Sequence, residues 1–339
     1  MAGYSALFDS VGLREWCDED KKPSLLSLKN LKGDEAEWYD LKFPSLDNLH
    51  EACAAIPQTR DMTAGLEEGF LAIRPALRMV LDPLTQPLSW MLDSALFLFT
   101  ATPWWFLVPL LIVGSYLVSK SGKIAAFVAL CLGFFLFIDH YTFAMETLAI
   151  IFVCTLICVL VGVPVGILMS KSDVTQRMLT PVLDMLQTLP TFVYLIPLIF
   201  LFNITEPKLY GMAIILYAIV PVIRLTNLGI RLVDKAVIEA ADAYGLNSRQ
   251  RLFGVEIPLA LPNIMAGVNQ TIMMSLAMVV IASLVSAPGL GTLVLDGINN
   301  LRLGVGFVAG FAIVLLAILL DRVSKAALDR INAAQANLK

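Results

Sequence analysis

The chain has 339 residues and a formal net charge of −4, and 58% of its residues are hydrophobic whereas only 15% are charged. Soluble domains average about 45–50% apolar and about 25% charged residues, so this composition excludes an ordinary soluble domain. The first 60 residues hold seven Lys/Arg and eleven Asp/Glu, which accounts for the whole net charge. Because no basic face emerges, we expect no nucleic-acid partner.

The N-terminal residues 1–60 form an acidic polar extension, which we expect to be periplasmic. Its first ten residues include Asp9 and no Lys or Arg. They therefore lack the basic start of a secretory signal, and we expect the first long helix to direct insertion. Cys17 and Cys53 can pair if this extension lies outside the cytoplasm. Residues 61–101 mix apolar and charged side chains, which predicts amphipathic helices at the membrane interface.

Seven apolar segments follow, each close to the roughly 20 residues that a helix needs to cross a bilayer. The predicted spans are 103–119, 123–138, 144–169, 180–202, 209–228, 260–286 and 305–321. Trp104 and Trp105 open the first span, as aromatic residues do at the level of the lipid headgroups. We therefore expect an all-α integral membrane protein with a transmembrane domain at 102–325 and a cytoplasmic tail at 326–339.

The Lys and Arg residues between these spans gather on one side of the predicted membrane. They are Lys120, Lys123, Lys171, Arg177, Arg224, Arg231, Lys235, Arg249, Arg251, Arg322, Lys325, Arg330 and Lys339. The opposite loops hold only Lys208 and Arg302. Because positive residues are retained in the cytoplasm, we expect the C-terminus inside and the N-terminus outside, with the chain in a bacterial inner membrane.

Enzyme and metal-site patterns are missing from the sequence. No HExxH, GxSxG or GxxxxGK[ST] pattern occurs, so we expect no catalytic residue and no ATP binding by this chain. The two histidines, His50 and His140, are too few for a metal site with the usual ligand spacing. Cys131, Cys154 and Cys158 lie in apolar runs and are interpreted as packing residues.

Acidic residues are scarce inside the predicted spans. Glu146 and Asp184 lie near span ends, and Asp296 lies in an outer loop. Proton-coupled carriers usually keep an ionisable residue at mid-membrane. This pattern argues against a proton-driven carrier and leaves a sodium carrier open. Asp184 is interpreted as a structural or interfacial acid.

Glycines and prolines interrupt several spans, and Pro190 and Pro197 interrupt the fourth. Proline removes a helical hydrogen bond and bends the helix. Such breaks survive in lipid where protein or a cavity satisfies the freed backbone groups. Two interpretations remain, namely ordinary packing between helices and a bent helix that lines a pathway.

The loop at 232–258 is long and charged, and its pattern predicts two short helices. The stretch before Gly245 is rich in helix-forming residues, and Gly245 suits the left-handed position that ends a helix. Asn247 or Ser248 can cap the second helix, and Pro258 stands before the sixth span. Such a bracket on the cytoplasmic face can dock into a groove of a partner, although a solvated amphipathic loop fits the same pattern.

Residues in this loop match a spaced motif. Three residues separate an EAA triplet from a glycine, and nine more lead to Val-Glu-Ile-Pro. This spacing resembles the EAA motif of ABC importer permeases that work with a binding protein, with Val255 and Ile257 in place of Ile and Leu. The residues that carry the resemblance are Glu239, Ala240, Ala241, Gly245 and Pro258.

Further stretches resemble the glycine betaine/proline betaine branch of these permeases. They are 186–197, 221–231, 265–274, 278–283 and 289–291. The resemblance covers roughly 80–325 and implies the transmembrane domain of a type I ABC importer, which works as a homodimer. It also implies two cytoplasmic ATPase subunits, which use the ATP, and a periplasmic solute-binding protein. No cofactor is expected on this chain itself.

Roles for the loop residues also follow from this resemblance. The loop would dock into a groove of the ATPase. Glu239 would orient or cap the loop through hydrogen bonds, and Ala240 and Ala241 would permit close approach. Gly245 would allow the turn. Closure of the ATPase dimer would then move the loop and tilt the bent helices.

Glycine betaine or proline betaine is the substrate that the resemblance implies. The same architecture importing trimethylamine N-oxide, choline or carnitine remains an alternative, as does an ATP-independent secondary transporter. In this family an aromatic cage on the binding protein holds the cation, so the permease needs only a low-affinity path. Candidates for that path are Pro190, Phe192, Tyr194, Pro197 and Tyr217, although aromatic residues more commonly face lipid or the core. The outer loop 287–304 is a candidate contact for the binding protein.

Overall fold

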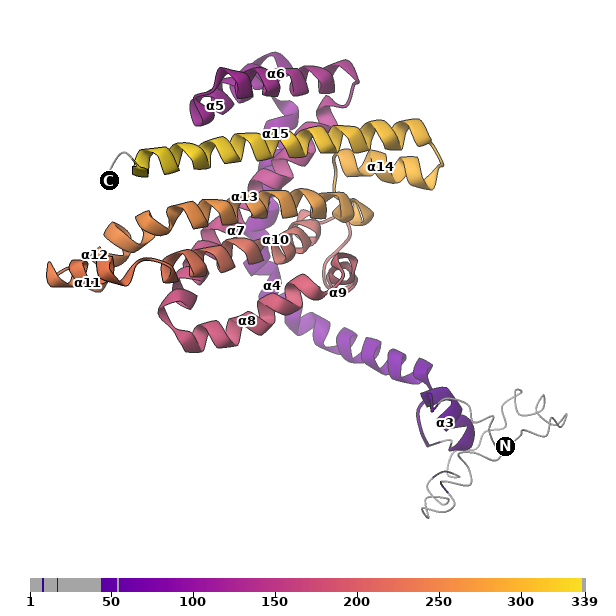
Figure 1. Ribbon diagram of the computed structural model, residues 1–339. Coiled ribbons are helices and arrows are strands. Elements are labelled where there is room, and N and C mark those ends of the chain that lie inside the picture. The colour runs from indigo at the N-terminus through magenta and orange to yellow at the C-terminus, as the bar shows by residue number, and fades with distance from the viewer. Residues whose placement is uncertain (1–7, 9–16, 18–43, 54, 337–339) are drawn as a thin grey trace, which may run out of the picture. The chain divides into compact units, whose positions relative to one another are not determined.

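The computed structural model describes residues 44–53 and 55–336 together with Phe8 and Cys17. Every regular element in this described part is helical, as the predicted all-α class requires (Figure 1). By its internal contacts the chain divides into two compact units, Met1–Leu77 and Arg78–Lys339, and each is described by itself.

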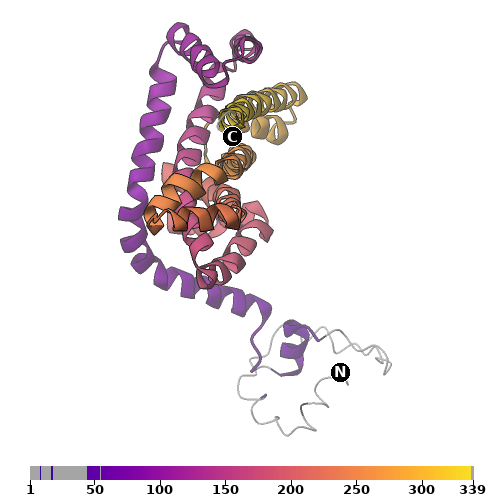
Figure 2. The ribbon, with the colours of Figure 1, turned by 60° about the vertical axis from the view of Figure 1, so that its left-hand side comes forward.

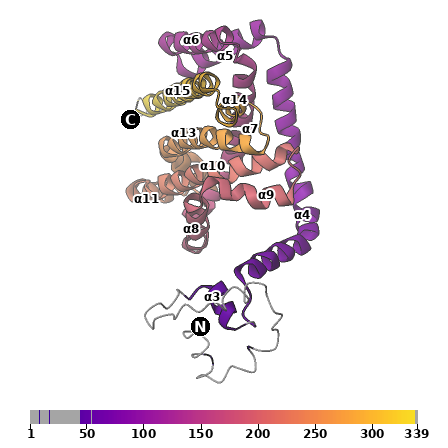
Figure 3. The same cartoon turned by 90° about the vertical axis from the view of Figure 1, so that its right-hand side faces the viewer.

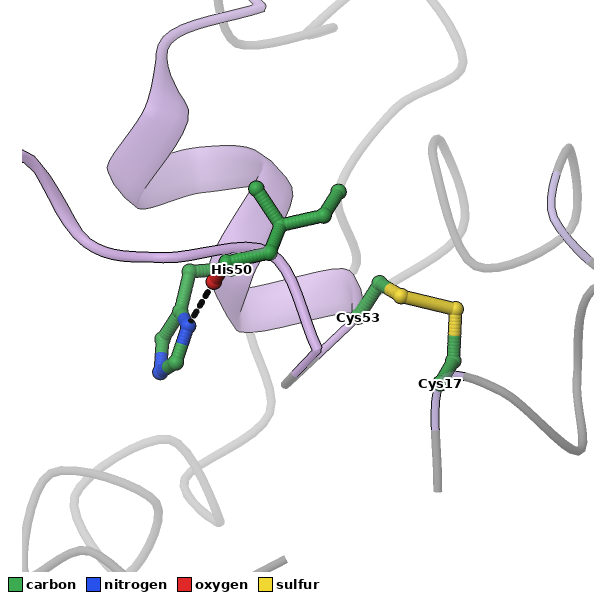
Figure 4. Close-up of a disulfide and its surroundings, with 4 residues drawn as sticks. Cys17, His50 and Cys53 are labelled. Atoms are coloured by element: carbon green, nitrogen blue, oxygen red, sulfur yellow. Dashed lines mark hydrogen bonds between the residues drawn. A yellow bond between two sulfur atoms is a disulfide. The ribbon is translucent and has the colours of Figure 1, made fainter. Parts of the chain in front are cut away.

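The first unit contains a short helix and a disulfide bond (Figure 4). Helix α3, Leu46–Ala52, begins after Ser45, whose hydroxyl accepts a hydrogen bond from the backbone N–H of Asn48 at 3.3 Å. Cys53 follows the helix and is bonded to Cys17. The pairing that the sequence leaves conditional is therefore present, and residues 1–7, 9–16, 18–43 and 54 of the acidic extension lie outside the described residues.

Helix α4, Thr59–Ala101, is continuous over 43 residues. We expected more than one helix at 61–101, because charged residues and prolines interrupt the apolar pattern there. In the structure Arg78 and Asp82 lie one helical turn apart, with 3.5 Å between Nε and Oδ2. Opposite charges at this spacing support a helix instead of ending it. The placement of α4 at the membrane interface stays a prediction.

The second half of α4 is held to the start of helix α10, Pro207–Arg231, by an ion cluster around one buried lysine. The Nζ atom of Lys208 lies 2.7 Å from Asp82 Oδ1 and 2.8 Å from Glu206 Oε2. Lys208 is only 5% exposed, and a buried ammonium persists only when it is well paired. We had placed Lys208 in an outer loop, whereas it lies in the first turn of α10 because Pro207 starts that helix.

The remaining helices of the second unit follow the predicted order. They are α5 (Trp104–Ser119), α6 (Gly122–Phe137), α7 (Tyr141–Lys171), α8 (Asp173–Thr188), η2 (Thr191–Tyr194), α9 (Leu195–Leu201), α10 (Pro207–Arg231), α11 (Lys235–Ala243), α12 (Ser248–Arg251), η3 (Leu252–Glu256), α13 (Ile257–Ala282), η4 (Ser283–Val285), α14 (Leu290–Asn299) and α15 (Leu303–Ala336). Four helices in the described part are long and apolar enough to span a membrane, or up to six if each of two bent pairs counts as one. This is fewer than the seven we expected, because α5 and α6 have 16 residues each, short of the roughly 20 needed.

Helix α10 lies at the centre of the second unit, with α7 and α13 packed along it (Figure 1). A methyl group added at Gly166 of α7 would come within 2.7 Å of the Ile223 carbonyl oxygen and 2.6 Å of Thr226 Cβ. At Gly267 of α13 an added methyl group would lie 3.0 Å from the Cα atom of Val222. Glycines at these positions let the helix backbones approach closely, as in other membrane proteins. Helix α15 lies between α13 and the α5–α6 pair.

The chain bends sharply after α8 (Figure 3). The helix axis turns by 107° between α8 and the segment Thr191–Leu201. Leu189 has φ −64° and ψ 135°, and Pro190 has φ −55° and ψ 131°. The residue before a proline is driven out of the helical region, which ends α8 at this point. The predicted bend is therefore present at Pro190, whereas Pro197 lies inside α9 without a break.

Candidate coupling site

The loop at 232–258, hereafter the bracket, folds into two helical arms (Figures 1 and 2). The first arm is α11, which begins after Asp234. The Asp234 carboxylate accepts a hydrogen bond from the backbone N–H of Ala236 at 2.9 Å. This local capping explains why the helix starts where the sequence predicts it.

Gly245 turns the chain between the two arms. Its φ angle is +78°, in the left-handed region. The N–H of Leu246 donates to the carbonyl of Ala241 at 3.2 Å, and the N–H of Gly245 donates to the carbonyl of Asp242 at 2.9 Å. This pair of bonds is the Schellman motif. An added Cβ would meet no heavy atom within 4 Å, so the turn needs glycine for its backbone conformation and not for space.

The second arm starts with a reciprocal cap. The side chain of Asn247 accepts from the N–H of Gln250, and the side chain of Gln250 accepts from the N–H of Asn247, both at 2.9 Å. Of the two predicted caps, Asn247 is the one used. The arm, α12, continues through a wider helical turn into α13, Ile257–Ala282, where Pro258 lies in the first turn. Displacement of this arm therefore displaces the end of a candidate membrane span.

The motif residues lie mostly on the surface of the bracket. Glu239, Ala240, Gly245 and Pro258 are exposed, and only Ala241 is buried, at 6% exposure. We expected Glu239 to brace the bracket through hydrogen bonds. Within the part of the chain that the structure describes, its carboxylate makes none, and the hydrogen bonds that brace the bracket come from Asp242. The role of Glu239 towards a partner stays a prediction.

A chain of ion pairs closes the bracket and fastens it to α7. The Nη1 atom of Arg251 lies 2.8 Å from both carboxylate oxygens of Asp242. Its Nε donates to Oε1 of Glu256 at 3.1 Å, and Lys171 at the end of α7 donates to Oε2 of the same residue. Glu256 is 2% exposed. Sequence reasoning missed these residues, although opposite charges at Asp242 and Arg251 within one loop were a signal for the first pair.

Candidate pathway residues cluster only in part around the bend. Tyr194 is buried at 7% exposure, and its hydroxyl donates to the carbonyl of Leu186 in the last turns of α8. Tyr217 of α10 is half-buried and close enough to interact electrostatically with Tyr194. Phe192 is 58% exposed. The two tyrosines thus interact beside the bend, whereas the side chain of Phe192, in the same short helix as Tyr194, is exposed.

Two cavities in the second unit lie away from these aromatic residues. One of about 440 Å³ runs along α8, between Asp173 and Pro181. Another of about 430 Å³ lies between His140 at the start of α7 and Val305 and Val308 of α15. None of the predicted pathway residues lines either cavity, so the pathway stays a prediction.

Metal-ligating side chains do not gather in the described residues, where no group of three His, Cys, Asp or Glu is placed to hold a metal ion. The Nδ1 atom of His50 lies 2.5 Å from the carbonyl oxygen of Ile56, as Figure 4 shows. The Nδ1 atom of His140 lies 2.6 Å from the carbonyl oxygen of Ile138. The buried thiols are those of Cys131, Cys154 and Cys158.

Comparison with known proteins places this architecture in one family. Residues 159–333 match the family described as the binding-protein-dependent transport system inner membrane component. The glycine betaine/carnitine transport permease protein GbuB of Listeria monocytogenes is 40% identical over 247 residues, which cover 72% of this chain and 87% of GbuB. The glycine betaine transport system permease protein OpuAB of Bacillus subtilis is 47% identical over 195 residues, which cover 56% of this chain and 68% of OpuAB.

A solved structure shows the same fold. The MetNI methionine ABC transporter, in an inward facing conformation, gives a TM-score of 0.52 at 18% identity, over 57% of this chain and 95% of the matched chain. The predicted fold class, that of an importer membrane domain, is thereby confirmed. Permease subunits of this kind are non-enzymatic membrane components that use ATP through a partner. The chain belongs to the family of binding-protein-dependent transport system inner membrane components, the membrane subunits of ABC importers.

Proposed function

We propose that this chain is the permease subunit of an ATP-driven importer of glycine betaine and related methylated amines. The similarity to GbuB over 72% of the chain carries the proposal, because GbuB and OpuAB are both permeases for glycine betaine. Proline betaine, carnitine, choline and trimethylamine N-oxide also carry a methylated nitrogen. They are the alternative substrates for the same architecture.

The bracket is the part of the chain suited to receive an ATPase subunit. Its surface exposes two large aromatic side chains, Tyr244 at 89% and Phe253 at 67%. Exposed apolar groups on a polar segment are typical of a protein contact. Ala240 is exposed on the first arm and its methyl side chain permits close approach. The free carboxylate of Glu239 is placed to accept hydrogen bonds from the partner.

In the assembled importer, two ATPase subunits bind and hydrolyse ATP on the cytoplasmic side, and this chain binds no cofactor of its own. A periplasmic solute-binding protein delivers the substrate to the outer loop 287–304, which contains α14. A second copy of this chain completes the pathway. ATP hydrolysis moves the bracket, and the bracket moves the helices around the bend at Pro190.

Cross-linking tests where the ATPase binds. In a chain freed of its natural cysteines, Tyr244→Cys places a thiol on the bracket. Leu301→Cys, at a residue that is 91% exposed in the α14–α15 turn, is the matched control. With a cysteine-reactive photo-cross-linker, we expect a product with the ATPase from Tyr244→Cys only. A product from Leu301→Cys and none from Tyr244→Cys would reverse the predicted orientation.

The pathway is proposed to pass the two tyrosines beside the bend, with Pro190 and Pro197 shaping that segment. A quaternary ammonium on the face of an aromatic ring gains about 0.5–1 kcal/mol at an exposed site. Replacing the ring in Tyr217→Leu should therefore raise the KM for glycine betaine about two- to fivefold, whereas Tyr217→Phe should keep it. Equal KM values for the two variants would remove Tyr217 from the pathway. The same comparison is made at Tyr194 with Tyr194→Leu and Tyr194→Phe, and at Phe192 with Phe192→Leu and Phe192→Tyr.

Competition for uptake tests the substrate class. Proteoliposomes would contain this chain, the ATPase and the binding protein encoded with it, and internal ATP. We expect uptake of labelled glycine betaine, competed most strongly by the amines that the binding protein accepts. No uptake of any methylated amine, with hydrolysis still stimulated by the binding protein, would keep the importer class and contradict the substrate class.

A further inference from the structure

The junction between α7 and α8 is bound by residues on both sides of the bracket. Lys171, the last residue of α7, pairs with Glu256 at the end of the second arm. Asp173, the first residue of α8, pairs with Arg231, which lies just before the first arm, at 2.7 Å. Both roots of the bracket therefore meet at one short turn of chain.

Each of these contacts is reinforced by a second one. Arg231 also donates to the carbonyl oxygen of Met169, in the last turn of α7, at 2.9 Å. The two oxygens of Glu256 are shared between Lys171 and Arg251. Because Glu256 is buried, separating it from either cation would leave a charge poorly compensated, which is unfavourable. The bracket and the end of α7 are thus held to move together.

The other side of the junction leads to the bend. The hydroxyl of Ser172 accepts a hydrogen bond from the N–H of Thr175 at 3.2 Å, which caps the start of α8 at the junction. At the far end of α8, the hydroxyl of Tyr194 bonds to the carbonyl of Leu186 across the bend. Asp184 of α8 is further paired with Arg224 of α10. A shift of the junction is therefore carried along α8 to the segment that follows Pro190.

We propose that Lys171, Asp173, Arg231 and Glu256 form a clamp that transmits movement of the bracket to α8 and its bend. They are positioning residues, since they touch neither ATP nor substrate. This inference rests on the proposed function, because a clamp that transmits movement matters only if the bracket is driven by an ATPase. A cluster that served only to stabilise the fold would change the amount or the thermal stability of the transporter, and would leave the ratio of hydrolysis to uptake unchanged in the molecules that fold.

The test compares the number of ATP molecules hydrolysed for each substrate molecule imported by the complete transporter in proteoliposomes. Glu256→Gln keeps the size of the side chain and removes its charge. We expect its ratio of hydrolysis to uptake to rise at least about fivefold, the low end of typical coupling between sites. Lys325→Gln, which removes the charge of an exposed side chain that pairs with Asp321 within α15, lies outside the junction and should keep the wild-type ratio.

A second variant is needed because Glu256 is buried, and a substitution there can impair folding as well as coupling. The side chain of Asp173 is exposed and that of Arg231 is partly exposed. Reagents can therefore reach the two thiols that the double substitution Asp173→Cys and Arg231→Cys introduces. The double variant should be uncoupled, and bridging its two thiols with a short reversible reagent should restore coupling. Release of the bridge should uncouple it again.

The outcomes separate the clamp from the proposed function. If the wild-type transporter imports no methylated amine with ATP, the proposed function fails. If the wild type is coupled and both clamp variants keep its ratio of hydrolysis to uptake, the clamp is wrong and the importer stands. A bridge between residues 173 and 231 that blocks transport would also overturn the clamp, because it would show that the two residues must separate.

Discussion

Arg251 binds both carboxylate oxygens of Asp242 across the turn of the bracket, through one nitrogen atom at 2.8 Å from each. The two residues lie nine positions apart and on different arms, so this contact fixes the angle between the arms. The recognised motif residues Glu239 and Ala240 stay exposed beside it. The bracket is thus held in shape by residues outside the motif, which leaves the motif free to meet a partner.

Loss of this contact should loosen the bracket. Arg251→Ala should lower the affinity of the chain for the ATPase subunit, because the arms are no longer held at one angle. Arg251→Lys should give an intermediate affinity, since an ammonium cannot reproduce the planar contacts of a guanidinium. Arg249→Ala, on the same exposed arm, is the matched control. The measurement is ATPase binding to the chain in nanodiscs, and equal affinities for the variants at positions 249 and 251 would contradict this prediction.

Gly245 should tolerate no β-branched residue. A left-handed conformation costs an L-residue roughly 1–2 kcal/mol, so Gly245→Val should distort the turn while the chain still inserts into the membrane. We expect lower uptake with hydrolysis that no longer responds to the binding protein. Gly254→Ala is the control in the same bracket, because an added methyl group there meets nothing within 4 Å and needs no positive φ. Wild-type uptake by the valine variant would show that this turn is not needed for coupling.

Gly166 should be intolerant of even one methyl group. The added Cβ of Gly166→Ala would meet the backbone of Ile223 and would push α7 away from α10. Overpacking of this kind costs about 1–3 kcal/mol and should lower the midpoint of thermal unfolding in detergent. Gly310→Ala in α15, where nothing lies within 4 Å of the added atom, should not lower it. Identical midpoints for the two variants would contradict the packing described for α7 and α10.

The disulfide between Cys17 and Cys53 should protect both thiols from labelling. It closes a loop with a sequence separation of 36 residues, and a loop of this size stabilises a folded segment by about 3–4 kcal/mol in the chain-entropy description. A membrane-impermeant maleimide added to intact cells should label these cysteines only after reduction. Labelling without reduction would exclude the bond. No labelling after reduction with an impermeant reductant would place the extension inside the cell.

The bracket was the most predictable part of the structure, because its signals act over a few residues. Asp234, Gly245 and Asn247 each fix a helix end through bonds to close neighbours in the sequence. The bend at Pro190 was predictable for the same reason, since proline acts directly on the residue before it. Local sequence signals alone therefore located the bracket and the bend at Pro190, between which the proposed coupling acts.

Contacts between segments that lie far apart in the sequence could not be predicted from local sequence signals. Lys171 and Glu256 are separated by 85 positions, and only the packing of α7 and α13 against α10 brings them together. For a related reason, fewer helices in the described part are long and apolar enough to span a membrane than the roughly seven spans that hydropathy predicts. Hydropathy reports how apolar a segment is, whereas the length and straightness of α5, α6 and α8 decide whether each one can cross a bilayer.

Dependence of uptake on internal ATP is the most direct test of the central claim. Proteoliposomes with this chain, its ATPase and its binding protein would be loaded with ATP or left without it, and the uptake of labelled glycine betaine would be followed over time. An ATP-driven importer predicts accumulation with internal ATP and none without it. Equal accumulation in the two preparations would contradict the importer and indicate a secondary transporter.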